Sequence, residues 1–308
     1  MSQSPWTRRV LWLLPVLPVA LILYYGIGMV VAHVIDDDPD TQPPAVEAAQ
    51  SRAVAMASRL ILREVDEHQW VANDPIFKPS AALDDMASYQ IGMLAAIARF
   101  ADNLAGLTLE NGDRDAELGR AAGLLKYPAT IWKFDLKSAW MPTASSEKQY
   151  RLAARNLEGF NAQLTSGASL YPRDAAMLAT LLDGFGTDMD AVIAQFDQHL
   201  EQSGWALLDT KADDLFYDSK GRAYAQSLVL RELGWDFATT IAQHNLADDW
   251  QAMLAALRQA AAQRPLWVVA AGENSALFAN HLANHGFRLL QARAKLAALA
   301  RALRSAEH

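Results

Sequence analysis

Residues 10–35 form a run of 26 residues that contains no Asp, Glu, Lys or Arg. Arg8 and Arg9 precede this run, and acidic residues follow it directly. At about 1.5 Å per residue, a helix of this length measures roughly 39 Å, which exceeds a hydrocarbon core of about 30 Å. The run therefore predicts a single transmembrane helix over residues 10–35, with the lipid bilayer as its partner.

The charges that flank the run predict its orientation. Cytoplasmic flanks of membrane helices are enriched in Lys and Arg, so Arg8 and Arg9 place residues 1–9 in the cytoplasm. Residues 45–308 then lie across the membrane, which is the periplasm if the membrane is the inner membrane of a Gram-negative cell. A cleaved signal peptide is the alternative, but its apolar region is usually about 7–15 residues long and ends in a small-residue cleavage site. Residues 10–35 form a longer run without such a site, which favours an uncleaved anchor.

The segment after the run is acidic and rich in proline. Residues 36–44 read Asp-Asp-Asp-Pro-Asp-Thr-Gln-Pro-Pro. This composition predicts a short stiff spacer that holds the following domain off the membrane surface.

Composition excludes several classes of function. The chain has a net charge of −8, and an acidic surface is a poor partner for nucleic acid, whose binding depends on Lys and Arg. The chain has no cysteine, which excludes a disulfide framework and thiolate chemistry. We therefore set aside nucleic-acid binding and thiol-based chemistry.

Apolar residues after residue 44 recur in alternating steps of three and four, which places each set on one helical face. This spacing predicts an all-α protein in which one bundle of about six to nine helices forms a single domain over residues 45–308. Only residues 266–270 resemble a strand, and one strand cannot form a sheet. The five stripes are Val46, Ala49, Ala53, Met56 and Leu60; Met86, Gln90, Met93, Ile97, Phe100, Leu104 and Leu107; Ala153, Leu157, Phe160 and Leu164; Leu178, Leu182, Phe185, Met189, Val192, Phe196 and Leu200; and Leu289, Ala292, Leu296, Leu299 and Leu303.

Two local patterns predict where helices end or turn. Residues 218–221, Asp-Ser-Lys-Gly, favour a type I turn. Gly286 directly follows His285, which favours a helix C-terminus there. His281 and His285 are four residues apart and could share a metal, but Leu282 stands where a metalloprotease motif has Glu. We expect a structural or capping role for both histidines and no metal site.

A short acidic segment offers the best polar candidate site. Asp213 and Asp214 lie close in sequence to Lys211 and Tyr217. Adjacent carboxylates can initiate a helix through its dipole, bind a cation or act as a general base. Helix initiation is the plainer interpretation, and a polar binding pocket is the alternative.

Two segments between predicted helices combine large aromatic rings with charge. The first contains Trp70, Asn73 and Phe77, and the second contains Trp132 and Trp140. Such rings commonly fasten loops to a bundle, and they also supply large contact areas in protein interfaces. We take these five residues as candidates for a protein-binding surface.

Sequence motifs for catalysis are absent. The chain contains no G-x-S-x-G elbow, Walker loop, dinucleotide fingerprint or H-E-x-x-H motif. We therefore expect no catalytic residue, metal or cofactor, and we favour a non-enzymatic structural or adaptor protein of the bacterial envelope. Such a protein binds another envelope protein or a second copy of itself. The alternative is a periplasmic ligand-binding module or hydrolase-like enzyme with an acidic pocket around Asp213 and Asp214.

The amino-acid sequences of several segments resemble those of one family of bacterial proteins, the "domain of unknown function 2333" family. This resemblance extends from about residue 10 to the C-terminus, and it implies a membrane-anchored envelope protein without implying an activity. The chain departs from the family pattern at Asp85, where the family usually has Asn, and at His285, where it usually has Gln. The segments that carry the resemblance are residues 70–79, 83–86, 90–93, 121–128, 140–147, 150–151, 209–217, 280–287 and 292–293.

Overall fold

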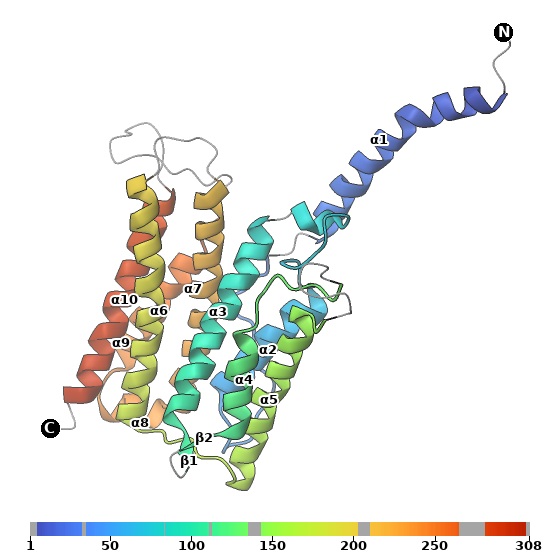
Figure 1. Ribbon diagram of the computed structural model, residues 1–308. Helices are drawn as coiled ribbons and strands as arrows, with labels where there is room; N and C mark the ends of the chain where they lie inside the picture. The colour runs from blue at the N-terminus through green and yellow to red at the C-terminus, as the bar shows by residue number, and fades with distance from the viewer. Residues whose placement is uncertain are drawn as a thin grey trace.

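α-Helices make up most of the described chain in the computed structural model, which describes residues 5–32, 35–82, 84–110, 113–134, 143–202, 210–264 and 281–305 (Figure 1). The all-α prediction is confirmed. A π-helical turn (η1, Arg63–Glu67) extends α2, a 3-10 turn (η2, Pro79–Ala82) precedes α3, and a short antiparallel pair (β1, Leu109–Glu110; β2, Asp113–Arg114) follows it. The α-helices are α1 Pro5–Ala32, α2 Arg52–Leu62, α3 Asp84–Leu107, α4 Ala116–Leu125, α5 Ser146–Ser166, α6 Ala175–Gln202, α7 Thr210–Asp236, α8 Ala238–Gln243, α9 Ala247–Ala261 and α10 His281–Ser305.

Helices α3 and α7 pack against each other at the centre of the bundle (Figure 1). Helices α2, α4 and α5 cover one side of this pair, and α6, α9 and α10 cover the other. One continuous cluster of buried apolar side chains runs through both sides. The described helices on both sides of the central pair therefore share one core.

Two glycines allow α3 and α7 to approach closely. A Cβ atom on Gly92 would lie 1.9 Å from the carbonyl oxygen of Asp218, and one on Gly221 would lie 2.1 Å from that of Tyr89. The type I turn expected at residues 218–221 is wrong, because α7 continues through them. Gly221 serves this helix contact and does not end the helix.

The apolar stripes locate four helices correctly. The stripes that start at Met86, Ala153, Leu178 and Leu289 lie in α3, α5, α6 and α10. The first stripe begins too early, because Val46 precedes α2 and Ser51 caps that helix by accepting a bond from the backbone nitrogen of Val54 at 3.1 Å.

Two other expectations concern the C-terminal part of the chain. The helix end expected at Gly286 is wrong, because α10 continues to Ser305. A Cβ on Gly286 would lie 3.2 Å from the ring of Phe196, so this glycine serves packing. The strand-like residues 266–270 lie outside the described residues.

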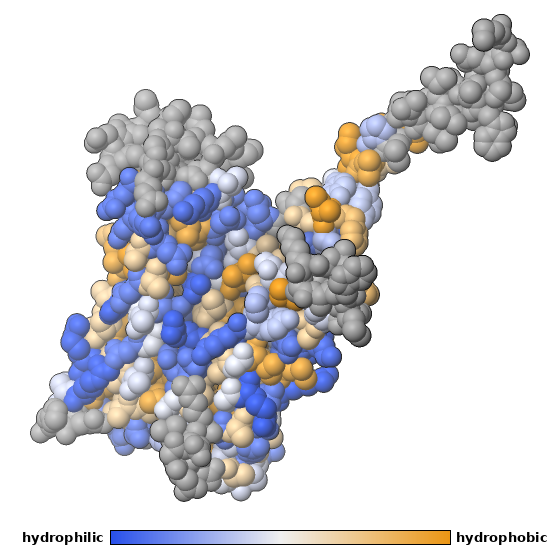
Figure 2. Space-filling view, viewed as in Figure 1, coloured by the Kyte–Doolittle hydropathy of each residue, from blue (hydrophilic) through white to orange (hydrophobic). Residues whose placement is uncertain are grey.

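Helix α1 extends away from the bundle and touches it only near its C-terminal end in Figure 1. The hydroxyl groups of Tyr24 and Tyr25 donate to the carbonyl oxygens of Phe77 and Ile76 at 3.1 and 2.6 Å. Orange apolar side chains lie along the described part of α1 in Figure 2, mixed with paler ones. The exposed large apolar and aromatic side chains of this helix are Val16, Val19, Leu21, Ile22, Leu23, Tyr24, Ile27, Val30 and Val31.

The membrane prediction for residues 10–35 has a mixed outcome. A helix covers most of this range, from Pro5 to Ala32. Within the part of the chain that the structure describes, no helix combines the length and apolarity that a membrane crossing requires. The membrane crossing is thus not confirmed.

Candidate functional site

The segment that follows α1 enters a buried polar network. The guanidinium group of Arg63 is almost fully buried and donates to both the side chain and the carbonyl oxygen of Asp36, at 3.2 and 3.1 Å. It also donates to the hydroxyl of Tyr224 at 2.8 Å. Burial opposes the charge of Arg63, but Glu64 and Tyr224 outweigh burial and raise its pKa. Arg63 therefore stays charged and holds the chain where it leaves α1.

Asp37 forms a second part of this network. Its carboxylate accepts a bond from Lys220 Nζ at 2.6 Å, and both side chains are only 2 % exposed. Arg264 also donates to Asp37. Burial raises the pKa of Asp37, but its bonds to Arg264 and Lys220 outweigh burial and lower it. The pair joins the segment after α1 to the middle of α7.

Backbone carbonyl groups of the same segment are bound as well. The hydroxyl of Tyr89 donates to the carbonyl of Asp36, and that of Tyr224 donates to the carbonyl of Asp38, both at 2.9 Å. Arg231 donates to the carbonyls of Pro39 and Thr41 at 2.8 and 2.5 Å. We call this set the clamp; it consists of Arg63, Tyr89, Lys220, Tyr224 and Arg231.

The first residues of the spacer predicted over residues 36–44 are bound to the bundle. In the sequence, Asp36 and Asp37 resemble a solvated acidic segment. In the structure, their carboxylates accept hydrogen bonds from Arg63 and Lys220 of the clamp. Their cationic partners come from η1, α7 and the residues after α9, so only the fold shows that the charges are compensated.

Two of the predicted binding residues are structural. Trp70 is 3 % exposed, donates from Nε1 to the carbonyl of Ala129 at 2.8 Å and meets Tyr150 edge to face. The amide of Asn73 is buried and donates to the carbonyl of Ile131 at 2.9 Å and to Glu147 at 2.8 Å. Both residues fasten a loop to α5 and its preceding segment, and they do not form a contact surface.

The other predicted aromatic residues lie at the surface. Phe77 is exposed and its ring meets that of half-buried Trp132 edge to face, with 5.8 Å between ring centroids. The structure thus brings together residues 55 positions apart, as the candidate surface requires. Trp140 lies outside the described residues.

The predicted acidic residues lie at the start of α7, as helix initiation requires. Asp213 faces Asp85 of α3, and Asp214 accepts a bond from Ser88 at 2.9 Å. Burial first, and then a bond to Asp85 and nearby carboxylates, raise the pKa of Asp213 to about 7. Burial also raises the pKa of Tyr217, and Lys211 is exposed. The residues that shift the pKa of Asp213 are other carboxylates, and no cation is among them.

The histidines do not form a metal site within the described residues, where no group of three or more His, Cys, Asp or Glu side chains could hold a metal ion. His285 is fully buried, and its Nδ1 lies 2.7 Å from the side-chain oxygen of Gln263. Burial, with Lys220 and Arg288 nearby, lowers the pKa of His285 to about 3, so the ring is neutral. The structural role expected for His285 fits this environment. The side chain of His281 lies outside the described residues.

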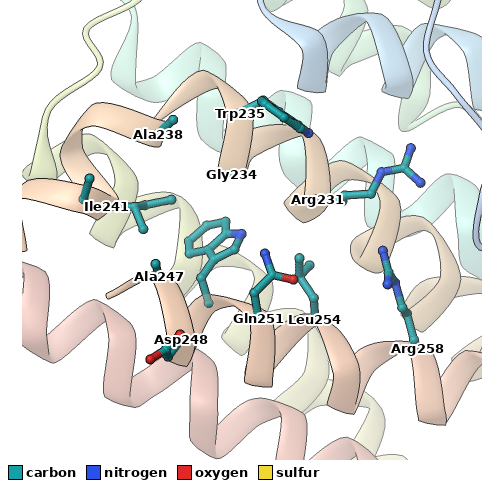
Figure 3. A pocket seen from close by; sticks show the side chains of 12 residues that line it. Arg231, Gly234, Trp235, Ala238, Ile241, Ala247, Asp248, Gln251, Leu254 and Arg258 are labelled. Carbon is teal, nitrogen blue, oxygen red and sulfur yellow. The ribbon is translucent and has the colours of Figure 1, made fainter. Parts of the chain in front are cut away.

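A groove between α7 and α9 was not anticipated from the sequence (Figure 3). It has a volume of about 350 Å³. Trp235 forms one wall with an exposed ring that the guanidinium of Arg52 approaches to 5.5 Å, and Trp250 forms the buried floor. Gly234 permits this arrangement, because a Cβ there would lie 2.5 Å from Trp250 Nε1.

The chemistry of the groove combines apolar contact with positive charge. Arg231 and Arg258 lie at one end of it, and Asp248 lies at the other in Figure 3. Such a groove can bind an apolar side chain next to a carboxylate. The sequence signals for this groove are Gly234 and Trp235 near the end of α7 and Trp250 in α9. Helical spacing alone does not show that these residues meet.

Comparisons with protein-family models, with curated proteins and with solved structures find no match to this chain.

Proposed function

We propose that this protein is a single-pass, membrane-anchored adaptor of the bacterial envelope. Residues 10–35 are its anchor in the inner membrane, and the helical bundle lies in the periplasm. The bundle binds another envelope protein and so holds that protein at the membrane.

One observation carries this proposal: α1 is the helix whose apolar side chains find no place in the bundle. Ile22, Val30 and Val31 are 71 %, 79 % and 73 % exposed. Each large apolar side chain left in water forgoes about 1.5–3 kcal/mol. A lipid environment around α1 recovers this free energy, and the flanking Arg8 and Arg9 favour an N-terminus in the cytoplasm. The resemblance to the "domain of unknown function 2333" family supports the same arrangement.

The clamp supports the adaptor role. An adaptor must hold its bundle in a defined position relative to its anchor. Arg63, Lys220 and the tyrosines bind the first residues after α1 through both side chains and backbone. The bundle is therefore joined to α1 by a fixed segment and not by a free tether.

The partner surface that we assign is the groove between α7 and α9. Its partner is a protein segment that presents an apolar side chain next to a carboxylate. Charge complementarity favours this chemistry, because the exposed Arg258 lines the groove. Arg52 and Arg231, which lie beside the groove, both pair with Glu232.

The acidic alternative has weaker support. A carboxyl group with a pKa near 7 suits proton transfer, and Asp213 has one. However, the groups that shift the pKa of Asp213 are the carboxylates Asp84, Asp85 and Asp214, and no cation is among them to stabilise a developing negative charge. We therefore propose no reaction for these residues.

Reporter fusions at the C-terminus test the anchoring. Alkaline phosphatase fused after His308 is expected to be active, and green fluorescent protein fused there is expected to be dark. The opposite pattern, or recovery of the intact chain without membranes, would refute the proposal.

Photocrosslinking in intact cells tests the groove. A benzoyl-phenylalanine residue at position 235 is expected to crosslink one envelope protein, and Arg258→Glu in the same chain is expected to reduce that crosslink. The control places the crosslinker at position 170, because Leu170 is also an exposed apolar residue. Equal crosslinking at both positions, or a crosslink that Arg258→Glu leaves unchanged, contradicts the groove as the partner surface.

A further inference from the structure

Four large apolar side chains gather beside the C-terminal part of α1. We call them the aromatic cluster; they are Ile76, Phe77, Trp132 and Phe134. Ile76 is 86 % exposed, Phe77 58 % and Phe134 50 %. The ring of Trp132 meets Phe77 and Phe134 edge to face, at 5.8 and 5.4 Å between centroids. The cluster thus has internal order, yet most of its apolar surface has no cover from the described part of the chain.

The position of the cluster along α1 is fixed by short contacts. Tyr25 donates to the carbonyl of Ile76 at 2.6 Å, and Tyr24 donates to that of Phe77 at 3.1 Å. One turn farther, a Cβ on Gly28 would lie 2.3 Å from Pro79 Cγ, so only glycine admits the proline ring there. The loop that carries Ile76 and Phe77 therefore lies level with Tyr24 and Tyr25.

The length of a membrane-spanning helix then sets the depth of this loop. A hydrocarbon core of about 30 Å requires about 20 helical residues. Counted from Arg9, 20 residues end near Met29, which is past Tyr24 and Tyr25. A tilted helix needs still more residues and places the two tyrosines deeper.

We propose that the aromatic cluster inserts into the periplasmic interface of the bilayer, next to the anchor. This inference rests on the anchoring proposed above and adds a second lipid contact, made by the bundle itself. Its occupant is lipid, because the cluster continues the apolar surface of α1 at a depth that the anchor must bury.

The chemistry of the surrounding residues fits a membrane interface. Tryptophan and tyrosine are enriched at that level, where one part of the ring meets lipid and another meets water. Lys133 lies with its Nζ 5.2 Å from the ring centre of Phe134 and can reach anionic headgroups. The tyrosine hydroxyls that donate to loop carbonyls satisfy polar groups where water is scarce.

Site-specific fluorescence in liposomes tests the insertion, and the absence of native cysteine makes single labels specific. The full chain is reconstituted with Ile22→Cys, Ile76→Cys or Leu170→Cys, each labelled with the environment-sensitive dye NBD. Ile22 reports the anchor, Ile76 reports the cluster, and Leu170 is an exposed apolar control in the loop before α6. Quenching by spin-labelled lipids is compared with quenching by aqueous iodide.

We expect lipid-borne quenchers to act on the labels at positions 22 and 76, whose emission shifts to shorter wavelength, and iodide to act on position 170. Lipid quenching at position 22 with only iodide quenching at position 76 overturns this inference and leaves the anchoring intact. Iodide quenching at position 22 overturns the anchoring itself. A further chain with Phe77→Ser and Phe134→Ser is expected to lose lipid quenching at position 76 and to keep it at position 22.

Discussion

At the scale of single residues, Lys220 and Asp37 show how the chain holds a charge inside the bundle. Both side chains are almost fully buried and are 2.6 Å apart. Removal of one partner of a buried ion pair leaves a charge without compensation, which costs about 3–5 kcal/mol. Arg264 still reaches Asp37 from the surface, so the lower end of this range applies.

Lys220→Met is therefore expected to lower the free energy of unfolding by about 3 kcal/mol at pH 7, measured by urea denaturation of the full chain in detergent. Lys126→Met is the control, because Lys126 pairs with Asp102 at the surface and its loss is expected to cost under about 1 kcal/mol. Asp37→Leu combined with Lys220→Met should recover most of the loss. A double variant as unstable as the single one would contradict the explanation by an unpaired charge.

Asp213 makes the folded chain less stable as pH rises, whereas a carboxylate paired with a cation has the opposite effect. Its pKa rises from an ordinary value of 3.8 to about 7 in the folded chain. Between these values the unfolded chain releases the proton and the folded chain keeps it, so stability falls as pH rises from about 4 to about 7. Asp213→Asn removes this penalty.

At pH 8, the Asp213→Asn variant is expected to be more stable than the parent chain by about 1 kcal/mol, a value that allows for solvent screening at a half-exposed site. Near pH 4, the two chains are expected to be equally stable. Thermal unfolding midpoints across this range measure the difference. Asp248→Asn, in the first turn of α9, is the control and is expected to show no such rise between the two pH values. A gain for Asp213→Asn that is equal at pH 4 and pH 8 would exclude a titration effect.

At the scale of elements, the contact between α3 and α7 depends on glycine. A Cβ on Gly92 would lie 1.9 Å from the carbonyl oxygen of Asp218, which is backbone and cannot rotate away. Gly92→Ala must therefore separate the two central helices and is expected to cost about 3 kcal/mol of unfolding free energy. Gly106→Ala, later in the same helix, meets no atom within 4 Å and is expected to be neutral or stabilising by up to about 1 kcal/mol. Equal effects of both substitutions in urea denaturation would show that the crossing does not depend on Gly92.

The same contact explains what the sequence could and could not predict about the elements. Apolar spacing found α3, α5, α6 and α10 because a helix that buries one face must repeat its apolar residues at helical period. Residues 218–221 read as a turn because local propensity favours one, but Gly221 meets a distant helix that the sequence does not reveal. Local patterns therefore predict helices well and helix contacts poorly.

The same limit applies to the candidate site: local features could be predicted from the sequence, and contacts between distant elements could not. The sequence identified an acidic helix start at Asp213, which depends on neighbours in the chain. It could not tell buried Trp70 from exposed Phe77, because their surroundings come from α5 and α1. It also could not show that the acidic residues after α1 pair with Arg63 and Lys220.

At the scale of the whole molecule, the clamp holds the segment that follows α1 against the bundle. Tyr89 and Tyr224 each donate a hydroxyl bond to the backbone of the segment after α1, at Asp36 and Asp38. Both tyrosines are buried, so the phenylalanine that replaces them keeps the packing and removes only the bonds. The combined variant Tyr89→Phe with Tyr224→Phe thus loosens the joint without removing a charge.

This joint can be measured as a distance between α1 and the far part of the bundle. Spin labels at Ile27→Cys and Leu170→Cys, two exposed positions in a chain without native cysteine, are expected to give a narrow distance distribution by double electron–electron resonance. The double tyrosine variant is expected to broaden it, because the segment after α1 keeps its ion pairs but loses two backbone bonds worth about 1 kcal/mol each. Tyr127→Phe removes a similar bond, to Ala144, away from this joint and is expected to leave the distribution narrow. An unchanged distribution in the double variant would mean that the two tyrosine bonds do not set the direction of α1, and that the remaining contacts do. These contacts are the ion pairs of Asp36 and Asp37 and the bonds from Tyr24 and Tyr25 to the loop at Ile76 and Phe77.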